Sequence, residues 1–247
     1  MAGRLSGRVA LVTGASRGIG YAVASAIAAE GAHVVALART VGGLEELDDA
    51  IRIAGGTATL VPADLRDYPA LDRLGAALFE RFGKLDVFIG NGGILGRLTP
   101  LAHVDPKLWD EVMAVNVTAN WRLIRSLDLL LRQSDSGRAL FVTSGVARRV
   151  PAYWGPYAAS KAALEALVRA YAAELRLTRV KANLVDPGPM ATRLRSIAFP
   201  GAAPDRWPRG RRHAWPAWGG PGGGRRPARV GAAGRRRCRP RGRRPGR

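Results

Sequence analysis

A glycine-rich turn near the N-terminus constrains the fold of this 247-residue chain more than any other feature. Gly14-Ala15-Ser16-Arg17-Gly18-Ile19-Gly20 follows an aliphatic run at residues 8–12 and leads into an amphipathic pattern at residues 18–30. A continuous aliphatic run is typical of a parallel strand buried on both faces. Glycines let the backbone turn tightly and approach a ligand closely, and the amides of a helix N-terminus attract a phosphate. The stretch therefore predicts a strand, a pyrophosphate-binding turn and a helix.

The rest of the chain up to about residue 205 alternates in the same way. Further strands are predicted at residues 33–37, 57–61, 85–89, 139–144 and 181–185, and helical patterns cover residues 42–54, 68–82 and 105–132. This order predicts one α/β domain at residues 1–205, a Rossmann-like doubly wound parallel sheet of six strands in three layers. A ligand site is expected at the carboxyl ends of the strands.

A second motif, Tyr157-Ala158-Ala159-Ser160-Lys161, opens an alanine-rich helical run. Residues four apart on a helix share a face, so Tyr157 and Lys161 can reach one site. A neighbouring cation favours the phenolate and lowers the pKa of a tyrosine from about 10. Such a tyrosine can exchange a proton with an alcohol–ketone pair. The spacing alone is common by chance.

Together the two motifs resemble those of the short-chain dehydrogenase/reductase family, from about residue 5 to about residue 200. The resemblance implies reversible hydride transfer between NADP(H) and a ketone or secondary alcohol. Tyr157 would carry the proton, Lys161 would lower its pKa and bind the nicotinamide ribose, and Ser144, thirteen residues before Tyr157, would orient the substrate. Asn116 would interrupt its helix and hold a water in a proton relay. The candidate catalytic residues are Asn116, Ser144, Tyr157 and Lys161.

The end of the second predicted strand bears on the choice of cofactor. An enzyme selecting NAD usually carries an acid there, on the ribose 2′-OH. This chain has Ala38-Arg39-Thr40 instead, and Arg39, assisted by Arg17, could pair with a 2′-phosphate. We therefore expect NADP(H) to be preferred over NAD(H).

The resemblance also implies the other cofactor contacts. Asp64 and Leu65 would lie at the adenine, and Thr192, in a Pro-Gly-x-x-x-Thr loop, near the nicotinamide. The family's Asn-Asn-Ala-Gly appears as residues 90–93, Gly-Asn-Gly-Gly, and the two extra glycines are expected to loosen this loop and weaken cofactor binding. The expected cofactor-binding residues are Gly14, Ser16, Arg17, Gly18, Ile19, Gly20, Arg39, Asp64, Leu65, Asn91, Gly93, Tyr157, Lys161, Pro187, Gly188 and Thr192. No metal site is expected.

The substrate stays open between a 3-oxoacyl thioester, a small ketone and a sugar. A mainly apolar pocket is expected from Val146, Val150, Tyr153, Trp154 and Met190. Residues 193–205 would begin a substrate flap, lined by Ile197 and Phe199.

Composition changes abruptly at Arg206. Residues 206–247 hold fifteen Arg, six Pro and no acid, whereas residues 1–205 hold 24 Lys and Arg against 19 Asp and Glu. No helical or strand period is present, and a disordered Arg/Gly/Pro-rich tail is expected in place of the family's last helix and strand. Three origins remain: a basic arm that binds nucleic acid, a solubilising tail, and a shifted reading frame of a G+C-rich gene, which we favour. The rival to the enzyme is thus an impaired or inactive protein whose tail binds nucleic acid non-specifically.

The remaining composition points to the cytoplasm. The single cysteine, Cys238, excludes an internal disulfide framework, and neither a secretory signal nor an apolar run of about 20 residues is visible. The expected partner is a small carbonyl or alcohol substrate. A homo-oligomer, weakened by the altered C-terminus, is also expected.

Overall fold

The computed structural model describes residues 3–201, which form one parallel six-stranded sheet in the order β3-β2-β1-β4-β5-β6. The strands are β1 (Val9–Thr13), β2 (His33–Ala38), β3 (Thr57–Pro62), β4 (Val87–Gly90), β5 (Arg138–Val142) and β6 (Lys181–Val185). The strand order reverses between β1 and β4, which is where a doubly wound fold opens a crevice. The predicted Rossmann-like fold is confirmed.

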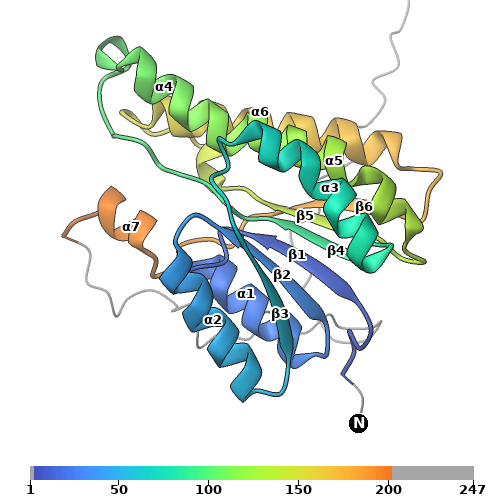
Figure 1. Ribbon diagram of the computed structural model, residues 1–247. Coiled ribbons are helices and arrows are strands. Elements are labelled where there is room, and N and C mark those ends of the chain that lie inside the picture. Colours follow the sequence, from blue (N-terminus) through green and yellow to red (C-terminus); the bar gives the residue numbers. More distant parts are fainter. Residues whose placement is uncertain (1–2, 202–247) are drawn as a thin grey trace, which may run out of the picture. The chain divides into compact units, whose positions relative to one another are not determined.

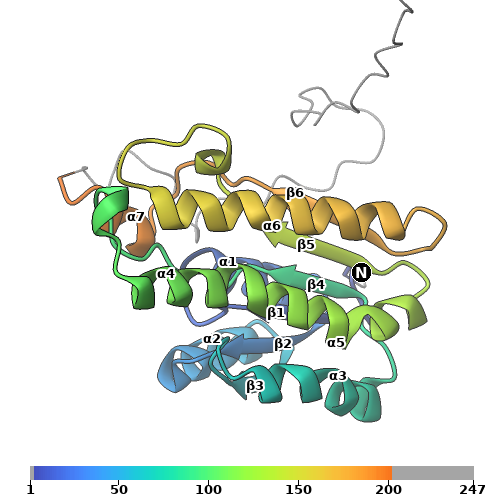
Figure 2. The ribbon, with the colours of Figure 1, turned by 90° about the horizontal axis from the view of Figure 1, so that it is seen from above.

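Helices cover both faces of the sheet (Figure 1). Helices α1 (Gly18–Ala29) and α2 (Val41–Ile53) lie on one face, and α3 (Tyr68–Phe82), α5 (Ala119–Gln133) and α6 (Gly155–Glu174) lie on the other. Figure 2 shows α4 (Pro106–Met113) leading towards α5, beside α6. Helix α7 (Arg193–Ala198) follows β6, and two short 3₁₀ helices, η1 (Leu101–His103) and η3 (Gly145–Ala147), lie in loops.

Two apolar cores explain why the central strands read as continuous aliphatic runs. In β1, Leu11 packs towards α3 and α5, whereas Val12 packs towards α1 and α2, and both are fully buried. Phe88 and Phe141 meet edge to face in the first core, with ring centroids 5.3 Å apart. Because both faces of the central strands are covered by helices, consecutive side chains along each of these strands are apolar. Their sequences therefore do not alternate between apolar and polar residues.

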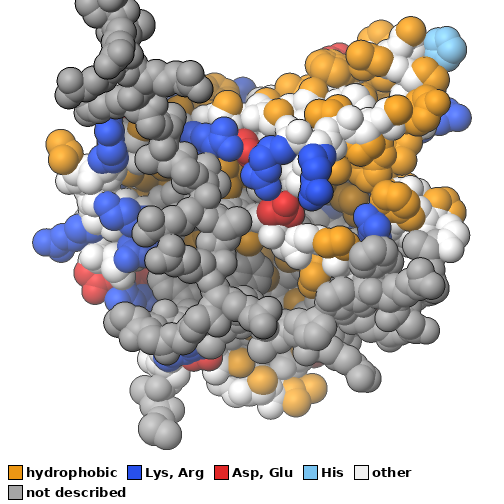
Figure 3. Space-filling model, turned by 180° about the vertical axis from the view of Figure 1, so that it is seen from behind, with side chains coloured by type: hydrophobic (Ala, Val, Ile, Leu, Met, Phe, Trp, Pro, Cys, Tyr) orange, Lys and Arg blue, Asp and Glu red, His pale blue; other side chains and the backbone are white. Residues whose placement is uncertain are grey.

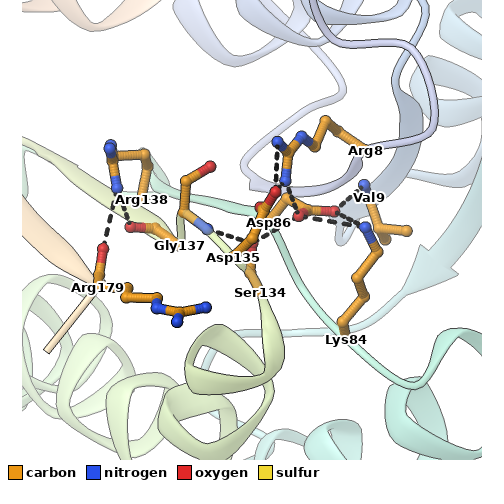
Figure 4. A network of polar contacts seen from close by, with 10 residues as sticks. Arg8, Val9, Lys84, Asp86, Ser134, Asp135, Gly137, Arg138 and Arg179 are labelled. Carbon is orange, nitrogen blue, oxygen red and sulfur yellow. Dashed lines mark hydrogen bonds and ion pairs between the residues drawn. The ribbon is translucent and has the colours of Figure 1, made fainter.

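Strand β4 begins two residues later than predicted because Asp86 is a buried polar junction below it (Figure 4). Its carboxylate accepts hydrogen bonds from the Val9 amide at 2.9 Å and the Ser134 hydroxyl at 2.6 Å. Arg8 and Lys84 lie 2.8 and 3.1 Å from it. A buried carboxylate is tolerated only when it is paired and hydrogen-bonded in this way. The junction joins the amino ends of β1 and β4 to the segment before β5, opposite the carboxyl ends where a ligand site is expected.

The predicted helix at residues 105–132 is interrupted. Helix α4 and helix α5 are separated by a π-helical segment, η2 (Ala114–Thr118), with Asn116 at its centre. Such segments widen one turn and occur frequently at functional sites. The expected interruption at Asn116 is confirmed.

Strand β6 is an edge strand within residues 3–201. Lys181 and Asn183 are exposed on it, while Ala182 and Leu184 pack towards α6. The arginine-rich tail, its disorder and its origin lie outside the described residues. In the described part, no helix is long and apolar enough to cross a membrane.

The described surface is of mixed charge. On the face seen in Figure 3, Lys and Arg side chains gather around Asp and Glu side chains. Among the described residues, ion pairs join Arg148 to Asp186 and Arg169 to Glu165. The large formal charge of +20 therefore reflects mainly the fifteen arginines after residue 205.

Candidate active site

A cavity of about 750 Å³ opens at the carboxyl ends of the strands. It gathers nearly all residues that the sequence singles out, from seven separate segments of the chain. Those that line it are Gly14, Ser16, Arg17, Gly18, Ile19, Arg39, Asp64, Leu65, Asn91, Gly93, Ser144, Tyr157, Lys161, Pro187, Gly188 and Thr192. Gly20 and Asn116 are buried behind its wall.

The glycine turn has the geometry that a phosphate cradle requires. Gly14 and Gly18 have φ of 65° and 60°, a left-handed conformation that side chains rarely adopt. A Cβ on Gly20 would lie 2.2 Å from the Gly14 carbonyl oxygen, so glycine there lets α1 pack against the turn. No side chain caps the start of α1, and its first amides remain available to an anion. The turn therefore fits the pyrophosphate of a dinucleotide.

Lys161 is the buried cation of the site. Its Nζ donates a hydrogen bond to the Val142 carbonyl oxygen at 2.8 Å and lies 5.8 Å from the centroid of the Tyr157 ring. Burial disfavours the ammonium and lowers the pKa of Lys161 to about 8. Lys161 can therefore gain or lose a proton close to neutral pH.

Tyr157 lies beside Ser144, whose hydroxyl hydrogen-bonds to it. Burial raises the pKa of Tyr157, the Ser144 bond opposes this, and the negative charge of Asp186 adds to it. In this structure the pKa of Tyr157 is raised, because desolvation of the phenolate is the largest effect. The expected lowering of this pKa by Lys161 stays a prediction. The phenol is fully protonated at neutral pH, which suits a proton donor.

Asn116 ties two parts of the site together. Its amide nitrogen donates to the Ile94 carbonyl oxygen and the Ser160 hydroxyl, both at 2.9 Å, and its oxygen accepts from the Ile94 amide at 2.8 Å. The loop after β4 is thereby fixed against α6. Sequence reasoning missed Ser160, which carries no signal of its own because its partner is 44 residues away.

The loop at residues 90–93 is held firmly. The Thr13 hydroxyl accepts hydrogen bonds from the amides of Asn91 at 3.0 Å and Gly92 at 2.9 Å. A Cβ on Gly90 would lie 2.6 Å from the Phe141 ring, and one on Gly92 would lie 2.5 Å from Leu65. The expected loosening is therefore wrong, since both glycines permit close packing. Weaker cofactor binding stays a prediction.

Arg39 lies at the cavity mouth, just after β2. Its side chain is 65% exposed and its Nη1 is 3.6 Å from Asp64 Oδ2. Asp64 also pairs with Arg66 at 2.9 Å, and chiefly this bond lowers the pKa of Asp64 to about 2. Arg39 and Arg17 thus place two cations along one end of the cavity.

The opposite end of the cavity is mainly apolar. Leu95, Tyr157 and Ala198 form a small buried cluster, and Trp154 packs against it with its ring 6.0 Å from that of Tyr157. Of the predicted pocket residues, Val146, Trp154 and Met190 line the cavity. Val150 and Tyr153 do not, because they project from the loop before α6 and are mostly exposed.

The two flap residues also differ from expectation. Ile197 and Phe199 do not line the cavity. The Phe199 ring instead lies 5.8 Å from the Trp154 ring, tilted by 41° to it. Helix α7 instead supplies Arg193, Leu194, Arg195 and Ala198 to the cavity.

Charged residues that the sequence did not single out surround the loop after β5. Arg148 lies 3.3 Å from both Glu165 on α6 and Asp186 after β6. Thr143 donates to the same buried Glu165 at 3.0 Å. These partners are 17 to 38 residues apart, so only the fold brings them together. Within residues 3–201 no group of His, Cys, Asp or Glu is suited to a metal ion.

Comparison with known proteins supports the expected membership of the short-chain dehydrogenase/reductase family. The sequence model of the short chain dehydrogenase family matches residues 8–201. A solved short chain dehydrogenase from Pseudomonas syringae is 39% identical, with a TM-score of 0.82, over 85% of this chain and 87% of that one. A solved Escherichia coli short chain dehydrogenase in complex with NADPH is 34% identical, with a TM-score of 0.79, over 85% and 88% of the two chains.

A curated relative carries the other cofactor in its name. The uncharacterized NAD-dependent oxidoreductase of Mycobacterium tuberculosis is 36% identical over 201 residues, which is 75% of this chain and 72% of that protein. Family match, fold and site agree with one another. The chain belongs to the short-chain dehydrogenase/reductase family of NAD(P)-dependent oxidoreductases.

Proposed function

We propose that this protein transfers a hydride reversibly between NADP(H) and a ketone or secondary alcohol. One observation carries the proposal: the Ser144 and Tyr157 hydroxyls and the buried Lys161 ammonium meet in the same cavity as the glycine turn. When bound, the dinucleotide supplies the hydride. The chain's own residues have to bind the substrate oxygen and provide the proton.

The hydroxyl groups divide these tasks. In reduction, the Ser144 hydroxyl donates a hydrogen bond to the carbonyl oxygen and steadies the developing alkoxide. The Tyr157 hydroxyl gives its proton to that oxygen as the carbon takes up the hydride. Lys161, whose pKa is about 8, then helps to return a proton to the phenolate, with a water held at Asn116 as the next relay member.

NADP(H) preference follows from the charge at the mouth of the cavity. Arg39 and Arg17 line it, and the strand before them ends in Ala38 rather than in an acid. A guanidinium binds a phosphate through paired hydrogen bonds, whereas a 2′-hydroxyl offers it much less. Among similar proteins one is named NAD-dependent and another was solved with NADPH, so family membership alone favours neither cofactor, and the proposed preference rests on Arg39 and Arg17.

The mainly apolar far end of the cavity suits an apolar substrate body. The wall formed by Val146, Trp154, Leu194 and Ala198 is compatible with a 3-oxoacyl thioester or a small ketone.

The Tyr157→Phe variant tests the proposed chemistry. Turnover with any reduced ketone should fall about 10²- to 10⁴-fold, the usual contribution of a general acid. NADPH affinity should stay nearly unchanged, because the lost hydroxyl serves the substrate oxygen. Lys161→Ala should damage both quantities. Near-normal turnover in Tyr157→Phe would refute the assignment of this residue as the proton donor.

Binding of NADPH to the purified chain separates the enzyme from its rival. Tight binding supports the oxidoreductase. No binding, together with retention on DNA that salt abolishes, would instead support an inactive protein that binds nucleic acid non-specifically.

A further inference from the structure

Arg149 lies at the reacting end of the cavity. It lines the cavity, and its Nη2 atom is 3.7 Å from where a Cβ on Gly145 would stand. Gly145 directly follows Ser144, the residue proposed to bind the carbonyl oxygen. The Arg149 guanidinium therefore lies beside the proposed reacting centre. It belongs to a different segment of the chain from Arg17 and Arg39, the arginines at the cofactor end of the cavity.

The Arg149 side chain has no hydrogen bond or ion pair to any described residue. Only its backbone amide is engaged, with the Gly145 carbonyl oxygen at 3.0 Å. The neighbouring Arg148 is different, because it lies 3.3 Å from both Glu165 and Asp186. Of these two adjacent arginines, one neutralises acids of the protein and the other is available to a ligand.

The acid closest to this region is already paired. Asp186 Oδ2 lies 3.2 Å from the same Cβ position on Gly145, but it is bound by Arg148, and Oδ1 accepts from the Gly188 amide at 3.0 Å. Asp186 therefore contributes little net negative charge against Arg149. The substrate end keeps an excess of positive charge.

A second guanidinium lies on the apolar side of the same region. The rings of Tyr157, Trp154 and Phe199 follow one another at 6.0 and 5.8 Å, and the Arg195 guanidinium lies 3.8 Å from the centroid of the last ring. Arg195 also lines the cavity. Arg195 is half-buried beside these rings, whereas Arg149 is exposed.

We infer that the substrate carries a carboxylate close to its reacting carbonyl or hydroxyl group, and that Arg149 binds this carboxylate. A guanidinium matches a carboxylate with two parallel hydrogen bonds, and the arrangement fixes the orientation of the substrate. The substrate class is then an oxo acid and the corresponding hydroxy acid, with the apolar wall receiving its hydrocarbon part. This inference rests on the proposed function and narrows it.

Matched pairs of acids and esters test the inference. The pairs are 2-oxobutanoate with its methyl ester and 4-oxopentanoate with its methyl ester, which place the carboxylate at two distances from the ketone. Each is titrated calorimetrically into the NADP⁺ complex, where no turnover occurs, and each is assayed with NADPH. The chain should bind at least one acid about tenfold or more tightly than its ester.

Three variants locate the effect. Arg149→Gln should weaken binding of that acid, and raise its KM, by about ten- to a hundredfold, as expected for a lost bond to a charged group, with little change for the ester. Arg149→Lys should recover part of the loss. Arg73→Gln removes an equal charge from an exposed position on α3 outside the cavity, and should change neither ligand.

Two results would overturn the inference. One is an equal effect of Arg149→Gln on acid and ester, or no effect on either. The other is failure of every acid to bind the NADP⁺ complex. In both cases NADPH oxidation with an ester or another neutral ketone would leave the proposed function standing, so the two failures are distinguishable.

Discussion

Lys161 shows at the scale of one residue how burial sets chemistry. Its ammonium is removed from water, so its pKa falls from 10.5 to about 8. Between these two values the unfolded chain holds a proton that the folded chain has released. The free energy of unfolding therefore rises with pH in this window, by up to about 3 kcal/mol from this group, and below pH 8 the full cost of the buried charge is present.

Lys161→Met should reveal this cost. Urea unfolding at pH 7 to 10 should show the stability of the variant relative to the native chain decreasing by about 2.5 kcal/mol as the pH rises. Lys181→Met, at an exposed position on β6, controls for the loss of a lysine. A constant difference between Lys161→Met and the native chain across this range would contradict the lowered pKa of Lys161.

We expect the Arg39 side chain to set the preference between NADPH and NADH. Arg39→Asp should narrow or reverse the preference for NADPH over NADH, because a carboxylate repels a 2′-phosphate and accepts a hydrogen bond from a 2′-hydroxyl. Dissociation constants for both cofactors, measured by fluorescence titration, check it. Arg52→Asp, at an exposed position on α2 outside the cavity, should leave the ratio of the two constants unchanged. If the ratio of the NADPH and NADH dissociation constants is the same before and after Arg39→Asp, Arg39 is only a surface charge and does not select the cofactor.

At the scale of elements, the loop after β4 depends on close packing. Gly90→Ala would place a Cβ 2.6 Å from the Phe141 ring and 2.7 Å from Asn120 Oδ1, both deep in the core. We expect a loss of about 1–3 kcal/mol of stability, as for other overpacked cores.

Gly42→Ala is the matched control for Gly90→Ala. Gly42 is helical and open, with no atom from outside its own helical turn within 4 Å of its Cβ position, so alanine there should stabilise α2 by about 0.5–1 kcal/mol. Denaturant unfolding of the two variants should therefore give changes of opposite sign. A neutral Gly90→Ala would mean that β4 and β5 can separate without cost.

At the scale of the whole molecule, the sheet is covered unevenly. Leu140 on β5 packs towards the α1 side but stays partly exposed, and Asn183 on β6 is exposed. A parallel sheet is stable when both faces are buried and its edges are protected. Within residues 3–201 no strand pairs with the outer side of β6. We therefore expect a weakly stable chain with weak assembly and weak catalysis.

The coding DNA tests the origin we propose for this deficit. Translated in the other two forward frames beyond about residue 200, it should yield an amphipathic helix followed by an aliphatic strand. If neither frame does so, the shifted frame is refuted, and the basic sequence at residues 206–247 is a feature of the protein itself.

The sequence by itself determined the fold class, six strands and the position of the site. Aliphatic runs of fixed length, the glycine turn and the Tyr157–Lys161 spacing are local signals, because each depends on backbone geometry within a few residues. Only the tertiary structure decided the raised pKa of Tyr157, the tight packing of Gly90 and the difference between Arg148 and Arg149. Burial and ion pairing depend on residues distant in the chain, and no local pattern records which of them will meet.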